Sequence, residues 1–190
     1  MKEKLYHVSH IPNLKILEPK KSTHGKSYVY ATKFLEVALF FGSDKSFGDF
    51  DGMYGGGETQ KPFFYEAYAG ALKRRFENVT CYIYEVDPKD FKENKTSYSA
   101  EVVSEKPVQV LKCTVVKNLY DKIISLYKKG KIDLRFYDKD NENYVTTINK
   151  HIKHRLKIFN TLKNKQTNQY KFCKEKFSEI IKELANENLK

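Results

Sequence analysis

The sequence predicts an α+β fold, in which a β-rich first part is followed by a helical, strongly basic C-terminal third. Short apolar runs bounded by glycine and proline fill residues 1–116, which is typical of strands. Amphipathic periodicity dominates residues 117–190, which is typical of helices. A chain of 190 residues with 40% hydrophobic and 14% aromatic content can bury a proper core. We expect an α+β domain over residues 1–116 and a helical extension over 117–190 that packs on it or projects from it.

The first strands are predicted from short apolar segments. Leu5–Val8 reads as a strand, and Leu14–Pro19 as a short extended piece that its proline ends. A polar loop then covers residues 20–26. Ser27–Ala31 is the next predicted strand.

A short helix is predicted directly after this strand. Thr32 is suited to cap the helix, and Gly42 ends it. Its apolar face consists of residues at helical spacing, namely Phe34, Val37, Ala38 and Phe41.

Glycine recurs at high density in residues 43–61, so we expect a loop there. Such a loop is commonly either mobile or shaped around a ligand. Because the segment lacks the Gly-Lys-Ser/Thr ending of a phosphate-binding loop, a lid over a neighbouring cleft is favoured over a phosphate cradle.

The remaining elements of the first part alternate between helix and strand. Phe63–Phe76 is aromatic and predicted to be helical. Val79–Val86 is the clearest strand of the chain. Tyr98–Val103 and Val108–Val116 are two more strands, separated by a bend at Pro107.

Helices dominate the C-terminal third. Leu119–Tyr127 is an amphipathic helix that ends before a glycine. Residues 131–143 are polar and predicted to be a loop. Two further helices, over about 144–162 and 167–188, are expected to form a hairpin.

Positive charge is concentrated in this third of the chain. Residues 1–116 carry 17 Lys and Arg against 15 Asp and Glu, whereas residues 117–190 carry 18 against 9. The density is highest around residues 149–157 and is sufficient to hold an anionic partner such as a nucleic acid. The alternative, which is common for lysine-rich surfaces, is a solvated helix face.

Cysteine usage and hydropathy exclude several classes of protein. The three cysteines are far apart and form no C-x-x-C pair, so neither a zinc site nor a disulfide framework is indicated. Cys81 and Cys113 lie in apolar strand-like runs and are predicted to be core residues. No apolar leader and no run long enough to cross a membrane is present, so we expect a cytoplasmic protein without a membrane partner.

Three predicted strands each carry one functional side chain among apolar neighbours, namely His7, Tyr30 and Glu101. Successive side chains of a strand face opposite sides, so each of these residues either joins the core or lines a groove beside it. Side chains from separate strands can meet in one cleft, and a shared cleft is the hypothesis that the sequence favours. Glu85 and Glu105 compete for the role of the carboxylate, but Glu101 is preferred because it opens an apolar strand.

Three other histidines are weaker candidates for a site. His24 lies in a polar loop beside a glycine. His151 and His154 are three residues apart, which corresponds to one helical turn, and have no acidic ligands near them in sequence.

The order of these motifs resembles the ADP-ribosyltransferase superfamily. The matching segments are Tyr-His-Val-Ser at 6–9, Val-Tyr-Ala-Thr at 29–32 directly before a helix, and Ala-Glu-Val-Val at 100–103. They are most similar to the branch with a His-Tyr-Glu triad, shared by diphtheria toxin and the poly(ADP-ribose) polymerases. The resemblance covers about residues 4–116 and implies a split core of two sheets.

The resemblance also implies a reaction, in which ADP-ribose is transferred from the substrate NAD to a protein or nucleic-acid acceptor and nicotinamide is released. Glu101 would then hold a ribose hydroxyl and stabilise the positive charge of the transition state. His7 would hold a hydroxyl of the adenosine ribose. Tyr30 and Phe41 would sandwich the nicotinamide, and Val8 and Ser9 would complete the NAD-binding strand.

The sequence departs from the family pattern at two positions. Val8 stands where the family has a glycine that approaches the nicotinamide amide, and a β-branched side chain there narrows the pocket. Ala38 stands where the polymerases usually have a serine. These departures leave three interpretations open, namely a catalyst with a modified pocket, a relative that acts on an ADP-ribosyl or 2′-phosphate group of RNA, and a catalytically inactive module of the same fold. The inactive module would bind a nucleotide or a nucleic acid.

Overall fold

The computed structural model describes residues 4–21, 26–96 and 98–187. The chain forms two compact units that interleave along the sequence. The first unit comprises the described residues of three segments, Met1–Asp44, Tyr54–Phe63 and Phe76–Asp133. The second unit comprises those of Lys45–Met53, Phe64–Arg75 and Leu134–Lys190. This partition has different bounds from the division after residue 116 that the sequence suggests.

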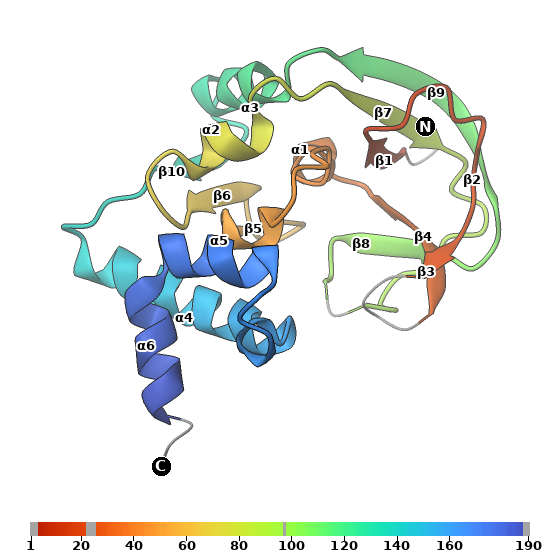
Figure 1. Cartoon of the computed structure of the whole chain (residues 1–190). Helices are drawn as coiled ribbons and strands as arrows, with labels where there is room; N and C mark the ends of the chain where they lie inside the picture. Colours follow the sequence, from red (N-terminus) through yellow and green to blue (C-terminus); the bar gives the residue numbers. More distant parts are fainter. Residues whose placement is uncertain (1–3, 22–25, 97, 188–190) are drawn as a thin grey trace. The chain divides into compact units, whose positions relative to one another are not determined.

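The first unit is built on a seven-stranded sheet that curls into an open half-barrel (Figure 1). Its strand order is β2-β9-β7-β1-β4-β3, and β8 also pairs with β4. Neighbouring strands along this order pair antiparallel, and so do β4 and β8. The strands are β1 (Leu5–Ser9), β2 (Ile16–Leu17), β3 (Lys20–Lys21), β4 (Ser27–Thr32), β7 (Cys81–Val86), β8 (Glu101–Ser104) and β9 (Val108–Val116).

The inner apolar residues of this sheet form one core cluster. Branched and aromatic side chains alternate along the strands, so one face of each strand is buried. The buried members are Leu5, Leu17, Val29, Ala31, Tyr84, Val86, Val102 and Val108.

Two helices belong to the first unit. Helix α1 (Leu35–Leu39) contacts β1, β4 and α3 (Leu119–Lys128). The prediction that Thr32 caps this helix is wrong, because the N-cap residue is Phe34 and no side chain caps the first turn. The Thr32 hydroxyl instead accepts a hydrogen bond from the Phe34 amide at 3.2 Å, before the helix begins. Asn118 caps α3 by accepting from the Asp121 amide.

A three-stranded sheet has the order β10-β6-β5. It is formed by β10 (Asp133–Arg135), β6 (Phe63–Glu66) and β5 (Gly52–Gly55). The chain passes from one compact unit to the other within each of these three strands.

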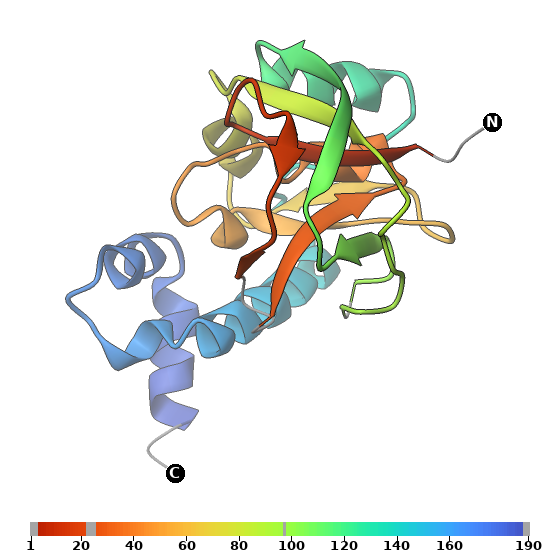
Figure 2. The same cartoon turned by 90° about the vertical axis from the view of Figure 1, so that its right-hand side faces the viewer.

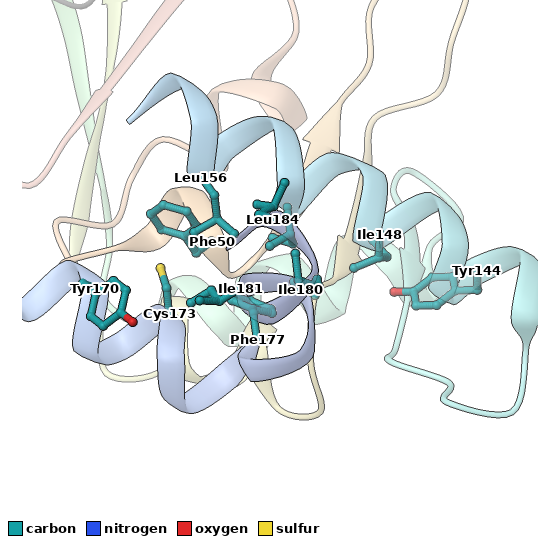
Figure 3. Packing of buried hydrophobic residues seen from close by; sticks show 12 residues of the cluster. Phe50, Tyr144, Ile148, Leu156, Tyr170, Cys173, Phe177, Ile180, Ile181 and Leu184 are labelled. Carbon is teal, nitrogen blue, oxygen red and sulfur yellow. The ribbon is translucent and has the colours of Figure 1, made fainter. Parts of the chain in front are cut away.

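The second unit is mainly helical. It contains most of α2 (Ala71–Phe76), together with α4 (Glu142–Ile158), α5 (Asn168–Lys176) and α6 (Ser178–Glu187). Its core takes Tyr144, Ile148, Ile152 and Leu156 from one face of α4, since these residues recur every four positions. Figure 3 shows the same face packed with the apolar residues of α5 and α6 and with Phe50.

A mixed α+β fold is confirmed, with six α-helices and two sheets in the described ranges, but several predicted elements are wrong in detail. Lys20 and Lys21, which were expected in a loop, form β3. Phe63–Phe76 is not one helix, since its first residues form β6 and its last form α2. The helix expected over 167–188 is broken at Phe177, whose φ of −135° leaves the helical region. Residues 131–143 contain the short strand β10.

The prediction that Cys113 belongs to the core is also wrong, whereas Cys81 is buried as expected. Cys113 lies in β9, whose residues Leu111–Val115 are exposed to solvent. No helix in the described part of the chain is long and apolar enough to cross a membrane.

Candidate functional site

The strand register places Glu101, the predicted carboxylate, beside β4, the strand that carries Tyr30. Glu101 of β8 pairs with Thr32 of β4, and Thr32 also pairs with Tyr6 of β1. Directly paired residues of an antiparallel sheet point to the same face, and so do residues two apart along one strand. Tyr30, Thr32 and Glu101 therefore lie on one face. Figure 2 shows β4 (orange) and β8 (green) running side by side.

The predicted histidine is fixed to the same strand by its ring. Nδ1 of His7 lies 2.8 Å from the backbone carbonyl oxygen of Tyr30. A carbonyl can only accept, so Nδ1 carries the proton, and in the neutral ring Nε2 is an acceptor. Burial lowers the pKa of His7 below its usual 6.5, against the opposing effect of the Tyr30 carbonyl, and the charge of Lys20 lowers it further.

The three predicted catalytic residues line one small cavity of about 80 Å³. The cavity is thus lined by residues of β1, β4 and β8. Tyr6, which pairs with Thr32, shares the face of Tyr30 and Glu101, whereas His7 is the next residue along β1 and its ring lies beside that of Tyr84 on the other face. The residues that line it are Tyr6, His7, Val8, Tyr30, Ala31, Thr32, Val37, Ala38, Phe41, Tyr98 and Glu101.

A second cavity of about 490 Å³ adjoins the small one. His7, Val8, Tyr30 and Phe41 line both, so they mark the boundary between the two spaces. The larger cavity extends from Ser9 past apolar residues to the side chains of Lys20 and Lys21. Its volume falls within the range of roughly 300–1,000 Å³ that is usual for small-molecule sites.

The two departures from the family pattern both border the small cavity. Val8 is 8% exposed, and a Cβ atom added at Gly42 would lie 2.9 Å from its Cγ1. The absence of a side chain at Gly42 therefore makes room for the bulk of Val8. Ala38 lines the cavity from α1 with a methyl group and no hydrogen-bonding atom.

Phe41 lies just beyond the end of α1 and is 46% exposed. Its ring meets that of Tyr54 edge to face, with centroids 5.6 Å apart. Because nearly half of the Phe41 side chain is exposed to solvent, Phe41 lies at the mouth of the two cavities that it lines and not in the core.

Sequence reasoning missed Tyr98 as a residue of the site. Its hydroxyl donates to the Gly56 carbonyl at 3.0 Å, and its own carbonyl accepts from the Glu101 amide at 3.1 Å. Burial raises the pKa of Tyr98, and the charges of Glu101 and Tyr54 raise it further. The one signal in the sequence is its position three residues before Glu101, which corresponds to a turn that leads into β8.

The competing carboxylates have other positions. Glu85 forms ion pairs with Lys4 at 3.2 Å and Lys112 at 3.6 Å. Glu105 is exposed in the bend that follows β8. Neither residue lines the small cavity.

The weaker histidine candidates are not at this site. His24 lies outside the described residues. His151 and His154 belong to α4 in the second unit. No group of three or more His, Cys, Asp or Glu side chains in the described ranges is arranged to hold a metal ion.

The glycine-rich segment is not the uninterrupted loop that the sequence predicts. Residues 48–50 form a 3₁₀ turn and Gly52–Gly55 form β5. Gly56 then adopts a φ of +127°, where an added Cβ would lie 2.5 Å from the Cα of Pro62. This glycine is required by a close approach of two backbones.

The basic stretch of the second unit is partly neutralised by α6. Lys153 lies 2.6 Å from Glu183, and Lys157 lies 3.8 Å from Glu187. These pairs flank an open groove of about 520 Å³ that also contains Lys150 and His154. The groove therefore presents charges of both signs.

No model of a known protein family matches the chain, and no curated protein sequence matches it either. The geometry of the two adjoining cavities is thus the basis for an assignment of function.

Proposed function

We propose that the chain is an NAD-dependent ADP-ribosyltransferase with the split two-sheet core of that superfamily. The observation that carries the proposal is that His7, Tyr30 and Glu101, from three strands, line one cavity together with Phe41. These are the residues that the resemblance selects. The acceptor is a protein or a nucleic acid.

Cleavage of the bond between nicotinamide and ribose develops positive charge on the sugar. A carboxylate placed beside that sugar stabilises the charge mainly in the transition state, which is the requirement for catalysis. Glu101 supplies this group, and Thr32, its cross-strand neighbour, adds a hydroxyl to the same cavity. The amide of Glu101 is held by the Tyr98 carbonyl, so the backbone of the carboxylate is fixed.

The other two residues of the set position the substrate. Neutral His7 offers Nε2 as an acceptor for a ribose hydroxyl, since its Nδ1 is engaged by Tyr30. Tyr30 and Phe41 provide aromatic surface for the nicotinamide ring at the boundary of the two cavities. The larger cavity accommodates the remainder of the dinucleotide, with Lys20 and Lys21 near its phosphates.

A second candidate function is a nucleotide-binding module without catalytic activity. Two observations favour it, namely the small volume of the cavity at Glu101, about 80 Å³, and the apolar side chains of Val8 and Ala38 in its wall. Such a module would bind ADP-ribose in the larger cavity and exclude nicotinamide.

A comparison of two glutamate variants tests the catalytic proposal. Glu101→Gln should lower the rate of nicotinamide release from NAD by about 100-fold or more, because it removes the charge that faces the transition state. Glu105→Gln, four residues later in an exposed bend, is the matched control and should leave the rate unchanged. An undiminished rate in Glu101→Gln would falsify the assignment of the carboxylate.

Calorimetric titration separates the two candidate functions. Binding of both NAD and ADP-ribose supports the enzyme, whereas binding of ADP-ribose alone supports the inactive module. Failure of both ligands to bind at millimolar concentration rejects both proposals.

The nucleic-acid acceptor is proposed from the charge of the second unit. Lys150 and His154 line the groove of α4 beside the ion-paired Lys153 and Lys157. A polyanion would compete with Glu183 and Glu187 for these two ion-paired lysines. An RNA mobility shift that weakens steeply with salt is expected. A shift that does not depend on salt, or no shift, would leave a protein as the acceptor.

A further inference from the structure

A third cavity, of about 480 Å³, adjoins the candidate site at Tyr98. It is lined by residues 54–60, Phe63, Tyr98 and Ser99, and we name it the Tyr98 pocket. Tyr98 also lines the small cavity that Glu101 lines. Tyr98 therefore marks the boundary between this pocket and the space in which NAD would be cleaved.

The loop that joins β5 to β6 is attached to the segment that leads into β8. The Tyr98 hydroxyl donates a hydrogen bond to the Gly56 carbonyl at 3.0 Å. A Cβ atom added at Gly57 would lie 3.4 Å from the Cβ of Ala100, the residue before Glu101. The wall of the Tyr98 pocket is therefore fixed next to the strand that carries the proposed catalytic carboxylate.

The side chains around the Tyr98 pocket are suited to a cation with a flat surface. Three aromatic residues line it, namely Tyr54, Phe63 and Tyr98, and Glu58 is the charged residue among them. No lysine, arginine or histidine of the described ranges lines the pocket, although the chain has a net charge of +11. Burial raises the pKa of Tyr98 and the charge of Glu101 raises it further, so a second carboxylate lies near this wall.

These features distinguish between classes of ligand. A site with carboxylates and no basic side chain repels phosphate groups and attracts cations. A guanidinium group is planar, stacks on aromatic faces and can form two parallel hydrogen bonds to one carboxylate. An ammonium group lacks this planar arrangement of donors.

We propose that the Tyr98 pocket binds the acceptor of the transfer reaction, and that the acceptor is an arginine side chain of a partner protein. The inference rests on the proposed function, because the pocket has this role only if NAD is cleaved beside it. A guanidinium nitrogen forms a bond to C1′ of the ribose while the bond from C1′ to nicotinamide breaks. Nicotinamide leaves as a neutral molecule with the electron pair of that bond, and the attacking nitrogen releases one proton to water.

Binding to the full chain can be measured by calorimetry without NAD. Agmatine and putrescine are matched probes, since they have the same carbon chain and the same charge at neutral pH, and only agmatine carries a guanidinium group. Agmatine should bind more tightly than putrescine. Glu58→Gln should weaken agmatine binding by about tenfold, because it removes the charged hydrogen-bond acceptor.

Glu105→Gln is the matched control for the charge of Glu58. Both glutamates are exposed, and Glu105 does not line the Tyr98 pocket. The control variant should bind agmatine as the wild type does. Because both side chains are exposed, the melting temperatures of the two variants should stay close to that of the wild type.

A transfer assay tests the identity of the acceptor. The full chain is incubated with NAD and a peptide that contains one arginine, with the same peptide carrying lysine in its place, or with a single-stranded RNA. Mass spectrometry should detect added ADP-ribose on the arginine peptide alone, and about tenfold less of it with Glu58→Gln.

The outcomes separate this inference from the proposed function. A wild type that releases nicotinamide but modifies the lysine peptide or the RNA instead of the arginine peptide overturns the inference and leaves the enzyme. Equal agmatine binding by the wild type and Glu58→Gln, or equal binding of agmatine and putrescine, overturns the assignment of the pocket. A wild type that releases no nicotinamide from NAD refutes the proposed function, and the acceptor role of the pocket with it.

Discussion

Nδ1 of His7 donates a hydrogen bond to the backbone carbonyl of Tyr30 at 2.8 Å, across 23 residues of sequence. This bond fixes which ring nitrogen is protonated and joins β1 to β4 at the cavity. Because both residues also line the larger cavity, a ligand that occupies the two spaces has to pass this pair. The protonation state of His7 is therefore expected to control binding.

We predict that NAD affinity is constant from pH 8 to about pH 6.5 and falls at lower pH. The pKa of folded His7 lies below 6.5, so the ring stays neutral at neutral pH and loses the Nε2 acceptor on acidification. The His7→Gln variant should bind NAD more weakly and without this pH dependence, as measured by calorimetry at four pH values. An identical pH profile in both proteins would show that His7 does not contact the ligand.

Val8→Ala is predicted to enlarge the cavity and to lower the free energy of unfolding by about 1–3 kcal/mol, because Val8 is buried against the backbone of Gly42. Nicotinamide should then bind more tightly than in the wild type. Val86→Ala is the matched control, since Val86 is buried in the core cluster of the sheet and lines neither cavity. The control variant should show a similar decrease in the free energy of unfolding, measured by urea denaturation, and unchanged nicotinamide binding. Equal effects of both variants on binding would contradict the role of Val8.

Stability is predicted to decrease as the pH falls from 6.5 towards 4. Burial lowers the pKa of His151 to about 4, and the charges of Arg155 and His154 lower it further. Between its usual pKa of 6.5 and this value the unfolded chain binds the proton that the folded chain excludes, so acid favours unfolding. The contribution is fully present above pH 6.5 and lost as the pH falls through this window.

His151→Gln should flatten the pH dependence of the urea midpoint. The same change at the exposed His10, which is not among the groups that shift the pKa of His151, should leave this dependence as in the wild type. A steep acid dependence that survives in His151→Gln would assign the effect to another group.

Asp51→Ala is predicted to destabilise the second unit by about 3 kcal/mol, because it leaves the guanidinium of Arg74 without its buried partner. The Asp51 carboxylate is fully buried and lies 2.7 Å from Nε and 2.5 Å from a terminal nitrogen of Arg74. The Tyr68 hydroxyl donates to the same carboxylate at 2.5 Å. Tyr68→Phe removes one hydrogen bond and no charge, so it should cost about 1 kcal/mol. Thermal unfolding of the two variants gives the comparison, and equal losses would argue against a charge effect.

The elements with strong local signals were predictable from the sequence. β7 is recognisable from its β-branched and aromatic run, and α3 from its periodicity and terminal glycine. The helix expected over residues 63–76 was wrong because an aromatic run is compatible with either a helix or a strand. Pairing of Phe63–Glu66 in a sheet, a long-range interaction, decides between them.

For the candidate site, the sequence by itself determined which residue types are available on which strands, and it singled out His7, Tyr30 and Glu101. The tertiary structure decided that they share a cavity, since this depends on the registers of β1 and β8 against β4, which pair residues about 25 and 70 positions apart. It also decided that Tyr98 belongs to the cavity and that Cys113 is exposed. The physical reason is that alternation along a strand determines which of its side chains share a face. The segment that covers this face is determined by contacts between distant parts of the chain, which the local sequence does not encode.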